Sequence, residues 1–435
     1  MIKIYDSRTN KLIPLDDEII SIYNCGPTVY NHIHIGNARP LVTFDVLVRL
    51  LKYKNKEYKY VLNITDIDDK IINEAQKQNK TEIQLSTFYM EQYFEIKNKL
   101  NTLPMINPRV SDNIDGIINY VDLLLEKGAA YIEDGDVYFD TTFSSTYGEI
   151  SKRKPDELLN GARVDIDHKK HHPNDFVLWK KTDLGIKWET NWSTGRPGWH
   201  SECSYLINKL IGKQVTIHGG GMDLKFPHHE NENAQNHALH DCSLAKIWMH
   251  IGMININNEK MSKSLNNFIL VKDILNKYSY QALRWFFYQS GYSNPLNYSD
   301  EIMSQMELEI TKLRNTINIA KTTLILNNFS YQSHNKITND FEKSLENNLN
   351  LNNAITEIYK VNKELNIAIK NKDTKNINEL MFYIINMLDI MGINFDNIHT
   401  SDNIELIKNW NKLIINKDYE NADSIRDILK QKGLL

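Results

Sequence analysis

The chain has 435 residues, which is enough for roughly two to four domains, each with a hydrophobic core of its own. Hydrophobic residues make up 41% of it and charged residues 24%, an ordinary balance that excludes a globally disordered chain. The net charge of −4 provides no general attraction to polyanions, so a nucleic-acid-binding surface would have to be local.

The N-terminus and the cysteines bear on where the protein works. The N-terminal MIKIYDSRTNKLIPL lacks the apolar core of a signal peptide, and no apolar run approaches the roughly 18 residues of a membrane span. The chain has three cysteines, Cys25, Cys203 and Cys242. A count that is both low and odd argues against a disulfide framework. We therefore expect a cytoplasmic protein without membrane contact, in which a cysteine with a chemical role is a ligand or a nucleophile.

The first part of the chain predicts a strand, a helix and a second strand. Residues 18–24 are apolar and aromatic, and residues 58–64 have the same character. Between them, residues 37–54 place apolar side chains on one face at helical spacing, with Pro40 in the expected first turn. This is the βαβ unit of a parallel, doubly wound α/β sheet.

The pattern changes between about residues 112 and 192. A helix near 114–127 is followed by YIEDGDVYFDTT, whose Asp-Gly pair between alternating runs predicts a β-hairpin. A polar, turn-rich stretch follows, which we interpret as an insertion outside the main sheet. The α/β pattern then resumes with a strand at 214–218, a helix from about 228 and a strand at 246–254.

Long helical patterns without strands dominate from about residue 300 and predict a separate helix bundle, followed by one short amphipathic helix in the tail. The helices are expected at 301–326, 338–348, 351–371 and 377–392. The predicted segments are 1–111 (catalytic domain, first half), 112–192 (connective insertion), 193–250 (catalytic domain, second half), 251–300 (loop and stem-contact region), 301–395 (helix bundle) and 396–435 (C-terminal segment).

The first motif with chemical character is CGPTVYNHIHIGNAR, residues 25–39, between the first strand and the helix. A helix N-terminus offers unpaired N–H groups and a positive dipole end, which suit a phosphate. Gly36 would let a ligand approach the backbone, and His34 would donate a hydrogen bond. Taken alone, the motif is equally compatible with an ordinary tight turn.

The second motif is KMSKS, with Lys260, Ser262, Lys263 and Ser264 in a polar loop after a strand. Two lysines beside two hydroxyls can hold a triphosphate and neutralise the charge that grows on leaving pyrophosphate. A generic lysine pair would be a solvated turn. Residues 34–37 of the first motif, His-Ile-Gly-Asn, form a HIGH-like element, and KMSKS lies downstream of it in an α/β chain. The two motifs together resemble the signature of class I aminoacyl-tRNA synthetases and related nucleotidyl transferases.

The third set of residues could hold a metal. Cys25 directly precedes the HIGH-like loop, and Cys203 ends GRPGWHSEC, while His228 and Glu232 in FPHHENE share one helix face. Two thiols, an imidazole and a carboxylate suit a four-coordinate zinc site. The alternative is that the cysteines are packing residues, as we expect for Cys242. His229 is expected to face away from the metal.

Several longer motifs stand in one order along the chain and carry a more specific resemblance. They are CGPTVY with HIG, LNITDIDDKI (62–71), DFVLWK (175–180), GRPGWHSEC (195–203), IHGGGMDLKFPHHENE (217–232), WMHIGM (248–253) and KMSKS. Together they resemble the cysteinyl-tRNA synthetase family from near the N-terminus to about residue 300, and more loosely beyond. The resemblance implies a Rossmann-like fold with an inserted connective domain and an anticodon-binding type of helix bundle.

In the family this chain resembles, one zinc ion binds the sulfur of the substrate cysteine directly. The matching ligands here are Cys25, Cys203, His228 and Glu232. Such selection makes physical sense, because a hydrophobic pocket discriminates poorly between cysteine and the near-isosteric serine, whereas a thiolate is a good zinc ligand. The same resemblance makes Thr28, Trp199, His200 and His218 the walls of the cysteine pocket.

The resemblance also assigns the ATP site. It implies ATP contacts from Thr28, His34, Gly36, Asn37, Gly219, Gly220, Gly221, Asp223 and Lys263, with His34, Asn37, Lys260 and Lys263 acting in catalysis. Magnesium is expected to accompany ATP. The implied partners are tRNA(Cys), ATP and L-cysteine, with neither DNA nor membrane, and we expect a monomer.

Two features depart from the family pattern. Asn37 stands where the fourth HIGH residue is normally histidine, and an amide cannot carry a proton or a charge. We therefore expect phosphate stabilisation to depend more on Lys263 and magnesium. The chain also ends at Leu435, soon after ADSIRDILKQKG, so we expect anticodon contacts to be reduced or shifted onto the helix bundle.

Two other functions remain open at this point. A related ligase that passes activated cysteine to a small amino sugar would share the zinc and KMSKS chemistry, but it would not need the predicted bundle at 301–395. A catalytically inactive RNA-binding paralogue is suggested only by Asn37, and the complete KMSKS and the four candidate ligands oppose it.

Overall fold

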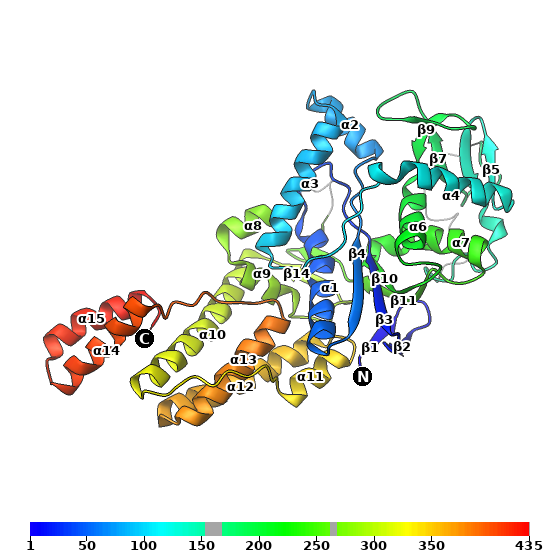
Figure 1. Cartoon of the computed structure of the whole chain (residues 1–435). Coiled ribbons are helices and arrows are strands. Elements are labelled where there is room, and N and C mark those ends of the chain that lie inside the picture. Colours follow the sequence, from blue (N-terminus) through cyan, green and yellow to red (C-terminus); the bar gives the residue numbers. More distant parts are fainter. Residues whose placement is uncertain (153–167, 262–267, 435) are drawn as a thin grey trace. The chain divides into compact units, whose positions relative to one another are not determined.

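The computed structural model describes residues 1–152, 168–261 and 268–434 (Figure 1). These form two compact units. The first comprises residues 1–255, 260–273 and 292–296, and the second comprises 256–259, 274–291 and 297–435. Each unit has its own helices and core and is described by itself below.

The first unit is built on a parallel four-stranded sheet with the order β11-β10-β3-β4. Its strands are β3 (Ile19–Asn24), β4 (Glu57–Leu62), β10 (Val215–Gly221) and β11 (Ala245–Ile251). Five of the six residues of β3 are buried, as expected for a parallel strand covered on both faces. The predicted parallel α/β sheet is therefore confirmed.

The strand order places a topological switch point between β3 and β10. The chain leaves β3 toward β4 on one side, and it leaves β10 toward β11 on the other. Ligands of open α/β sheets bind at the carboxyl ends of the strands where the connections diverge in this way. The segments that follow Asn24 and Gly221 are therefore the places where a site is expected.

Helix α1 (Ile35–Tyr53) follows β3 and is buried along nearly its whole length. It begins two residues earlier than predicted, so Pro40 is its sixth residue and lies in the second turn, not the first. Because proline has no N–H, the carbonyl of Gly36 loses its helical donor. The prediction for Pro40 is wrong, because the helix begins earlier than expected.

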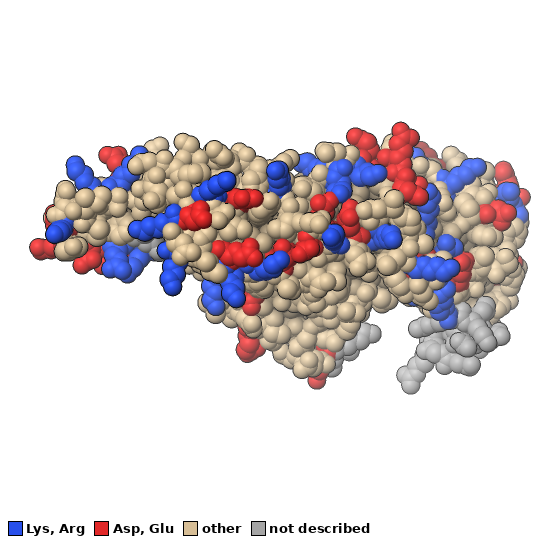
Figure 2. Space-filling model, turned by 90° about the horizontal axis from the view of Figure 1, so that it is seen from below, with Lys and Arg blue, Asp and Glu red and all other residues tan. Residues whose placement is uncertain are grey.

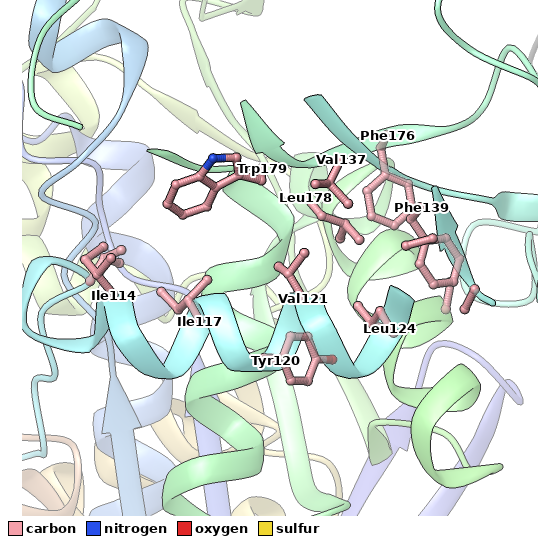
Figure 3. Close-up of a cluster of buried hydrophobic side chains, with 14 of the residues drawn as sticks. Ile114, Ile117, Tyr120, Val121, Leu124, Val137, Phe139, Phe176, Leu178 and Trp179 are labelled. Atoms are coloured by element: carbon pink, nitrogen blue, oxygen red, sulfur yellow. The ribbon is translucent and has the colours of Figure 1, made fainter. Parts of the chain in front are cut away.

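The insertion forms an antiparallel sheet with the order β5-β6-β7-β9-β8. Its strands are β5 (Ala130–Glu133), β6 (Asp136–Phe139), β7 (Phe176–Lys181), β8 (Trp188–Glu189) and β9 (Thr194–Pro197). The predicted hairpin is β5–β6, and the sheet extends past residue 192 to include β9. Helix α4 (Ile114–Glu126) packs Ile117, Val121 and Leu124 against this sheet (Figure 3).

The other elements before residue 300 are mostly short. They are β1 (Lys3–Asp6), β2 (Lys11–Pro14), α2 (Asp69–Lys77), α3 (Glu82–Lys99), α6 (Trp199–Leu210), α7 (His228–His240), β12 (Ile254–Ile256), β13 (Glu259–Lys260), α8 (Val271–Lys277), α9 (Tyr280–Phe287) and β14 (Leu296–Tyr298), with single 3-10 turns at Ser111–Asn113, Thr141–Phe143 and Met222–Lys225. Strands β1 and β2 form a hairpin, and β13, β12 and β14 form a small sheet.

The second unit is mostly helical. Its long helices are α10 (Asp300–Leu326), α11 (Asn339–Glu346), α12 (Leu351–Asn371), α13 (Thr374–Ile390), α14 (Ser401–Ile415) and α15 (Tyr419–Gln431). The four helices predicted between 301 and 392 are confirmed within a few residues. Helix α14 was not predicted separately, and it pairs with α15 around Ile407 and Leu429.

Surface charge is mixed, in agreement with the small net charge. On the face shown in Figure 2, lysine and arginine side chains are interspersed with aspartate and glutamate side chains. None of the helices in the described part of the chain combines the length and apolar character that crossing a membrane requires.

Candidate functional site

Four potential metal ligands meet at the switch point of the parallel sheet. Cys25 directly follows β3, and its N–H donates to the carbonyl of Gly219 at 3.1 Å, which fixes the loop to β10. Cys203 comes from α6, and His228 and Glu232 lie one turn apart at the start of α7. One ligand atom from each of the four lies within 4.8 Å of the others. The structure thus brings together the complete set predicted from the sequence.

The distances within this cluster fit a four-coordinate metal. The two Sγ atoms are 3.9 Å apart, and Cys25 Sγ lies 3.7 Å from Glu232 Oε1. A tetrahedral site with zinc–sulfur bonds of about 2.3 Å has sulfur–sulfur edges of about 3.8 Å. A third edge, from His228 Nε2 to Glu232 Oε1, is only 2.7 Å long and is a hydrogen bond that a metal would have to open.

Protonation in the cluster is governed by burial and by the neighbouring groups. Hydrogen bonding to Cys25 lowers the pKa of Cys203 to about 6, whereas burial raises the pKa of Cys25 well above its usual range. Burial opposes ionisation of Glu232, but His228 and His218 hold its pKa well below the ordinary value. Burial likewise opposes protonation of His228, yet Glu232 and Cys203 raise its pKa to about 10. These shifts favour the Cys203 thiolate and the Glu232 carboxylate, whereas Cys25 and His228 would each have to lose a proton to bind a metal.

His218 holds the Glu232 carboxylate from behind. Its Nε2 is hydrogen-bonded to Glu232 Oε2, and its Nδ1 lies 3.0 Å from the carbonyl oxygen of Tyr23. His218 is fully buried, and its ring meets Trp248 at 4.8 Å between centroids. This contact leaves Glu232 Oε1 to face the cysteines. His218 therefore holds the Glu232 carboxylate in place, and its expected position in the wall of the cysteine pocket stays a prediction.

His229 does not point away from the cluster, so that prediction is wrong. Its Nε2 lies 3.5 Å from Cys25 Sγ, and its Nδ1 is 2.9 Å from His250 Nε2. Its ring packs against His218 on β10 and against Trp248 and His250 on β11, which places it beside Cys25. A second possible ligand set therefore exists, namely Cys25, His218, His229 and Glu232.

Trp199 and His200 lie against the imidazole of His228. The Trp199 ring stacks on the His228 ring with centroids 4.2 Å apart, and 37% of Trp199 is exposed. His200 Nδ1 is 3.1 Å from His228 Nδ1, and burial lowers the pKa of His200 to about 3. Lys70 Nζ lies 5.8 Å from the centroid of the Trp199 ring. The tryptophan thus covers the metal cluster on its exposed side.

Three polar residues that the sequence did not single out support the cysteines. Asn63 Oδ1 accepts a hydrogen bond from the N–H of Gly26 at 2.9 Å and lies 3.8 Å from Cys203 Sγ. Thr65 Oγ1 donates to the buried Glu202 at 3.1 Å. Asn63 and Thr65 belong to the motif LNITDIDDKI, which follows β4. Because the end of β4 lies beside the end of β3, the position of this motif was the sequence signal that could have identified them.

A cavity of about 700 Å³ opens from the cysteines along the start of α1. Its lining includes most of the residues assigned to ATP and the substrate, namely Cys25, Thr28, His34, Gly36, Asn37, Trp199, Cys203, Gly221, Asp223 and His228. Gly219 and Gly220 lie further back in β10. A Cβ at Gly219 would come within 2.1 Å of the carbonyl oxygen of Met249, so this glycine is required by the close approach of β10 and β11.

The N-terminus of α1 points its polar groups into this cavity. The N–H of His34 donates to Asn37 Oδ1 at 3.2 Å, so Asn37 closes the first turn of the helix. Gly36 has little room for a side chain, because a Cβ would approach the His34 ring at 3.0 Å and Met261 Cε at 3.1 Å. The side chain of Lys260 and residues Ser262, Lys263 and Ser264 lie outside the described part of the chain.

Cys242 agrees with its expected packing role. It is half-buried beyond the end of α7, where its Sγ lies 3.7 Å from Asn236 Nδ2. It belongs to neither ligand set.

Residues 11–308 match the family model described as the tRNA synthetases class I (C) catalytic domain. The chain is 53% identical to the cysteine–tRNA ligase of Ureaplasma parvum and 48% identical to that of Malacoplasma penetrans. Each of these alignments covers 100% of both proteins. The cysteine–tRNA ligase of Mycoplasma pneumoniae is 42% identical over 99% of this chain and 98% of that protein.

Solved structures with similar folds are also aminoacyl-tRNA synthetases. The Mycobacterium tuberculosis methionyl-tRNA synthetase with methionyl-adenylate gives a TM-score of 0.62 at 11% identity, covering 95% of this chain and 94% of that one. The Agrobacterium radiobacter leucyl-tRNA synthetase in its ternary complex gives 0.64 at 10% identity, covering 93% and 86%. At such low identity these matches support the fold alone.

Proposed function

Because the chain belongs to the cysteine–tRNA ligase family, we propose that Cys25, Cys203, His228 and Glu232 hold a zinc ion that selects the substrate cysteine by its sulfur. The chain is a class I aminoacyl-tRNA synthetase that activates its amino acid with ATP and transfers it to tRNA. The observation that carries the proposal is the meeting of two thiols, an imidazole and a carboxylate at one end of the ATP cavity.

The first ligand set is favoured over the second by its donor chemistry. It contains two thiols, and zinc binds thiolates strongly. In the second set, His218 and His229 are already engaged with Tyr23 and His250 through their other ring nitrogens. A histidine that binds a metal makes such bonds, and so does a histidine that only orients a ligand, so these bonds do not separate the two sets. The number of sulfur atoms bound to the metal does separate them.

A bound zinc ion would stabilise the thiolate of cysteine and bind the hydroxyl of serine poorly. The residues around it position the rest of the substrate. Trp199 covers the cluster, and the cavity leads from Cys25 to the N-terminus of α1. Cysteine held at the cluster therefore has its carboxylate directed toward the ATP phosphates.

The N-terminal turn of α1 supplies the electrostatic part of the reaction. Its positive dipole end stabilises the phosphates, and we assign His34 as an additional donor and Asp223, which also lines the cavity, to the ribose. The cysteine carboxylate attacks the α-phosphorus in line and pyrophosphate leaves, with Lys263 assigned to neutralise its charge. A magnesium ion bound with ATP would add to this neutralisation. The 2′-hydroxyl of the terminal tRNA adenosine then attacks the carbonyl carbon, and AMP leaves.

The remaining assignments rest on the same family membership. We assign tRNA(Cys) as the acceptor, residues 301–395 as a bundle of the anticodon-binding type, and residues 112–192 as a connective insertion. The protein is proposed to act as a cytoplasmic monomer.

The direct test is ATP–pyrophosphate exchange that depends on cysteine, followed by charging of purified tRNA(Cys). The expected result is exchange with cysteine, little or none with serine, and a charged tRNA. Exchange without charging would favour the amino-sugar ligase, and the absence of both would favour an inactive paralogue.

Replacing His218 with phenylalanine should weaken metal binding by about tenfold to a hundredfold, because the substitution removes the hydrogen bond that orients Glu232. Phenylalanine is somewhat larger than histidine, so the buried space remains filled by an aromatic ring that lacks the two nitrogens. Competition with a chelator measures the metal affinity. His240→Phe is the matched control, since His240 contacts Asn208 outside the cluster and its loss should leave metal affinity unchanged. Equal affinities in both variants would contradict the role of His218.

Replacing Asn37 with histidine should raise the rate of cysteinyl-adenylate formation several-fold, because a histidine can place a charged donor at the phosphates. The KM for cysteine should not change, since Asn37 lies in the first turn of α1 and belongs to neither ligand set. Asn37→Ala separates the effect of charge from that of helix capping, and it should cost about 1 kcal/mol of stability. An unchanged exchange rate in Asn37→His would refute the compensation by Lys263 and magnesium.

A further inference from the structure

Three aromatic rings form a half-exposed platform at the rim of the ATP cavity. His32 lies in the loop that leads into α1, and Phe88 and Tyr89 lie on the second turn of α3. The His32 and Tyr89 ring centroids are 5.2 Å apart at 90°, and those of Phe88 and Tyr89 are 5.1 Å apart at 74°. His32 also approaches Phe88, with centroids 6.3 Å apart. The three rings contact one another edge to face, and 43% of Phe88 is exposed.

The platform is continuous with the cavity. His32 lines the cavity itself, and so does Tyr93, which lies one helical turn after Tyr89 on α3. Along α3 the aromatic side chains therefore run from the cavity wall at Tyr93 outward to the exposed ring of Phe88. A ligand that entered the cavity from this side would cross the platform.

Cations flank the rings. Lys80 Nζ lies 5.4 Å from the centroid of the Phe88 ring and 3.2 Å from Gln78 Oε1, whose own amide donates to the Tyr89 hydroxyl at 3.4 Å. At His32, burial and Lys272 lower the pKa, and Asp273 opposes them. One lysine is thus near the Phe88 ring and another is near His32. Exposed aromatic faces beside lysines are the combination by which proteins bind single-stranded nucleic acid.

We propose that the His32–Phe88–Tyr89 platform stacks an unpaired nucleotide of the tRNA 3′ end and guides the terminal adenosine into the cavity. The proposal rests on the proposed function, because the reaction brings that end to the cysteinyl-adenylate. Bases of single-stranded RNA stack readily on exposed aromatic rings, whereas paired stems do not offer their faces. The platform acts on tRNA alone, since cysteine and ATP bind deeper in the cavity.

The test compares Phe88→Ala with the unchanged enzyme in two assays. Cysteine-dependent ATP–pyrophosphate exchange, run without tRNA, should be unaffected, including the KM for ATP. In charging of tRNA(Cys), the KM for tRNA should rise about tenfold or more, the loss expected from one stacked base. Phe88→Trp should restore the KM, and Ile83→Ala, an exposed residue of the same helix, should leave it unchanged.

Equilibrium binding distinguishes the 3′ end from other parts of tRNA. Phe88→Ala should weaken binding of intact tRNA(Cys) and have no effect on a tRNA that lacks its unpaired 3′ nucleotides. Equal weakening for both tRNAs, an unchanged KM, or a raised KM for ATP in exchange would each overturn the proposal. Absence of ATP–pyrophosphate exchange in the enzyme without substitutions would instead contradict the proposed function. The comparison of the two tRNAs in the binding assay would still test the platform.

Discussion

Cysteine-dependent ATP–pyrophosphate exchange should fall at least about a hundredfold when Cys25 is replaced by serine. Replacing a residue that only orients a metal ligand already lowers metal affinity or activity by about tenfold to a hundredfold, and Cys25 is itself a proposed ligand. A serine hydroxyl keeps nearly the same shape but is a poor zinc ligand at neutral pH. Metal content should fall in parallel with activity.

Cys242→Ser is the control for this experiment. It makes the same chemical change at a half-buried thiol that belongs to neither ligand set. It should leave both metal content and exchange close to those of the unchanged enzyme. A Cys25→Ser variant that activates cysteine as well as Cys242→Ser does would contradict the assignment of Cys25 as a ligand.

Replacing Gly26 with alanine should destabilise the protein by about 3 kcal/mol or more and displace Cys25 from the cluster. A Cβ at this position would lie 1.5 Å from the backbone oxygen of Asn63. No side-chain rotation relieves a clash with backbone, so the ends of β3 and β4 would have to separate. The measurements are thermal unfolding and metal content.

Gly128→Ala is the matched control. Gly128 has a φ of +72° and no atom within 4 Å of the position of a Cβ, so its replacement tests backbone strain without a clash. It should cost only about 1–2 kcal/mol and leave the metal content unchanged. Similar losses of stability in the two variants would show that the contact between Gly26 and Asn63 is not what fixes the loop.

The sequence predicted the ligands because their residue types and their motifs were informative. The i, i+4 spacing of His228 and Glu232 placed both on one helix face, and the family resemblance supplied the two cysteines. What it could not give was the direction of neighbouring side chains. His229 was expected to face away, but its ring packs against side chains of β10 and β11 and lies beside Cys25.

The fold was predictable where periodicity was strong. The parallel strands and the long helices after residue 300 were recognised from their patterns, whereas α2 and α3 were missed because they are short or mixed in polarity. The expected start of α1 was two residues too late, so Pro40 was placed in the first turn although it lies in the second. Residues such as Asn63 and His218 gained their roles from sheet register, which joins strands distant in sequence.

Zinc-edge X-ray absorption of the purified chain tests the central claim most directly. The account predicts one zinc ion per chain with two sulfur ligands, from Cys25 and Cys203, rising to three sulfurs when cysteine is added and staying at two with serine. One sulfur before addition would indicate the set that contains His218 and His229. A chain without zinc, or a sulfur count that cysteine does not change, would contradict selection of the substrate through its thiolate.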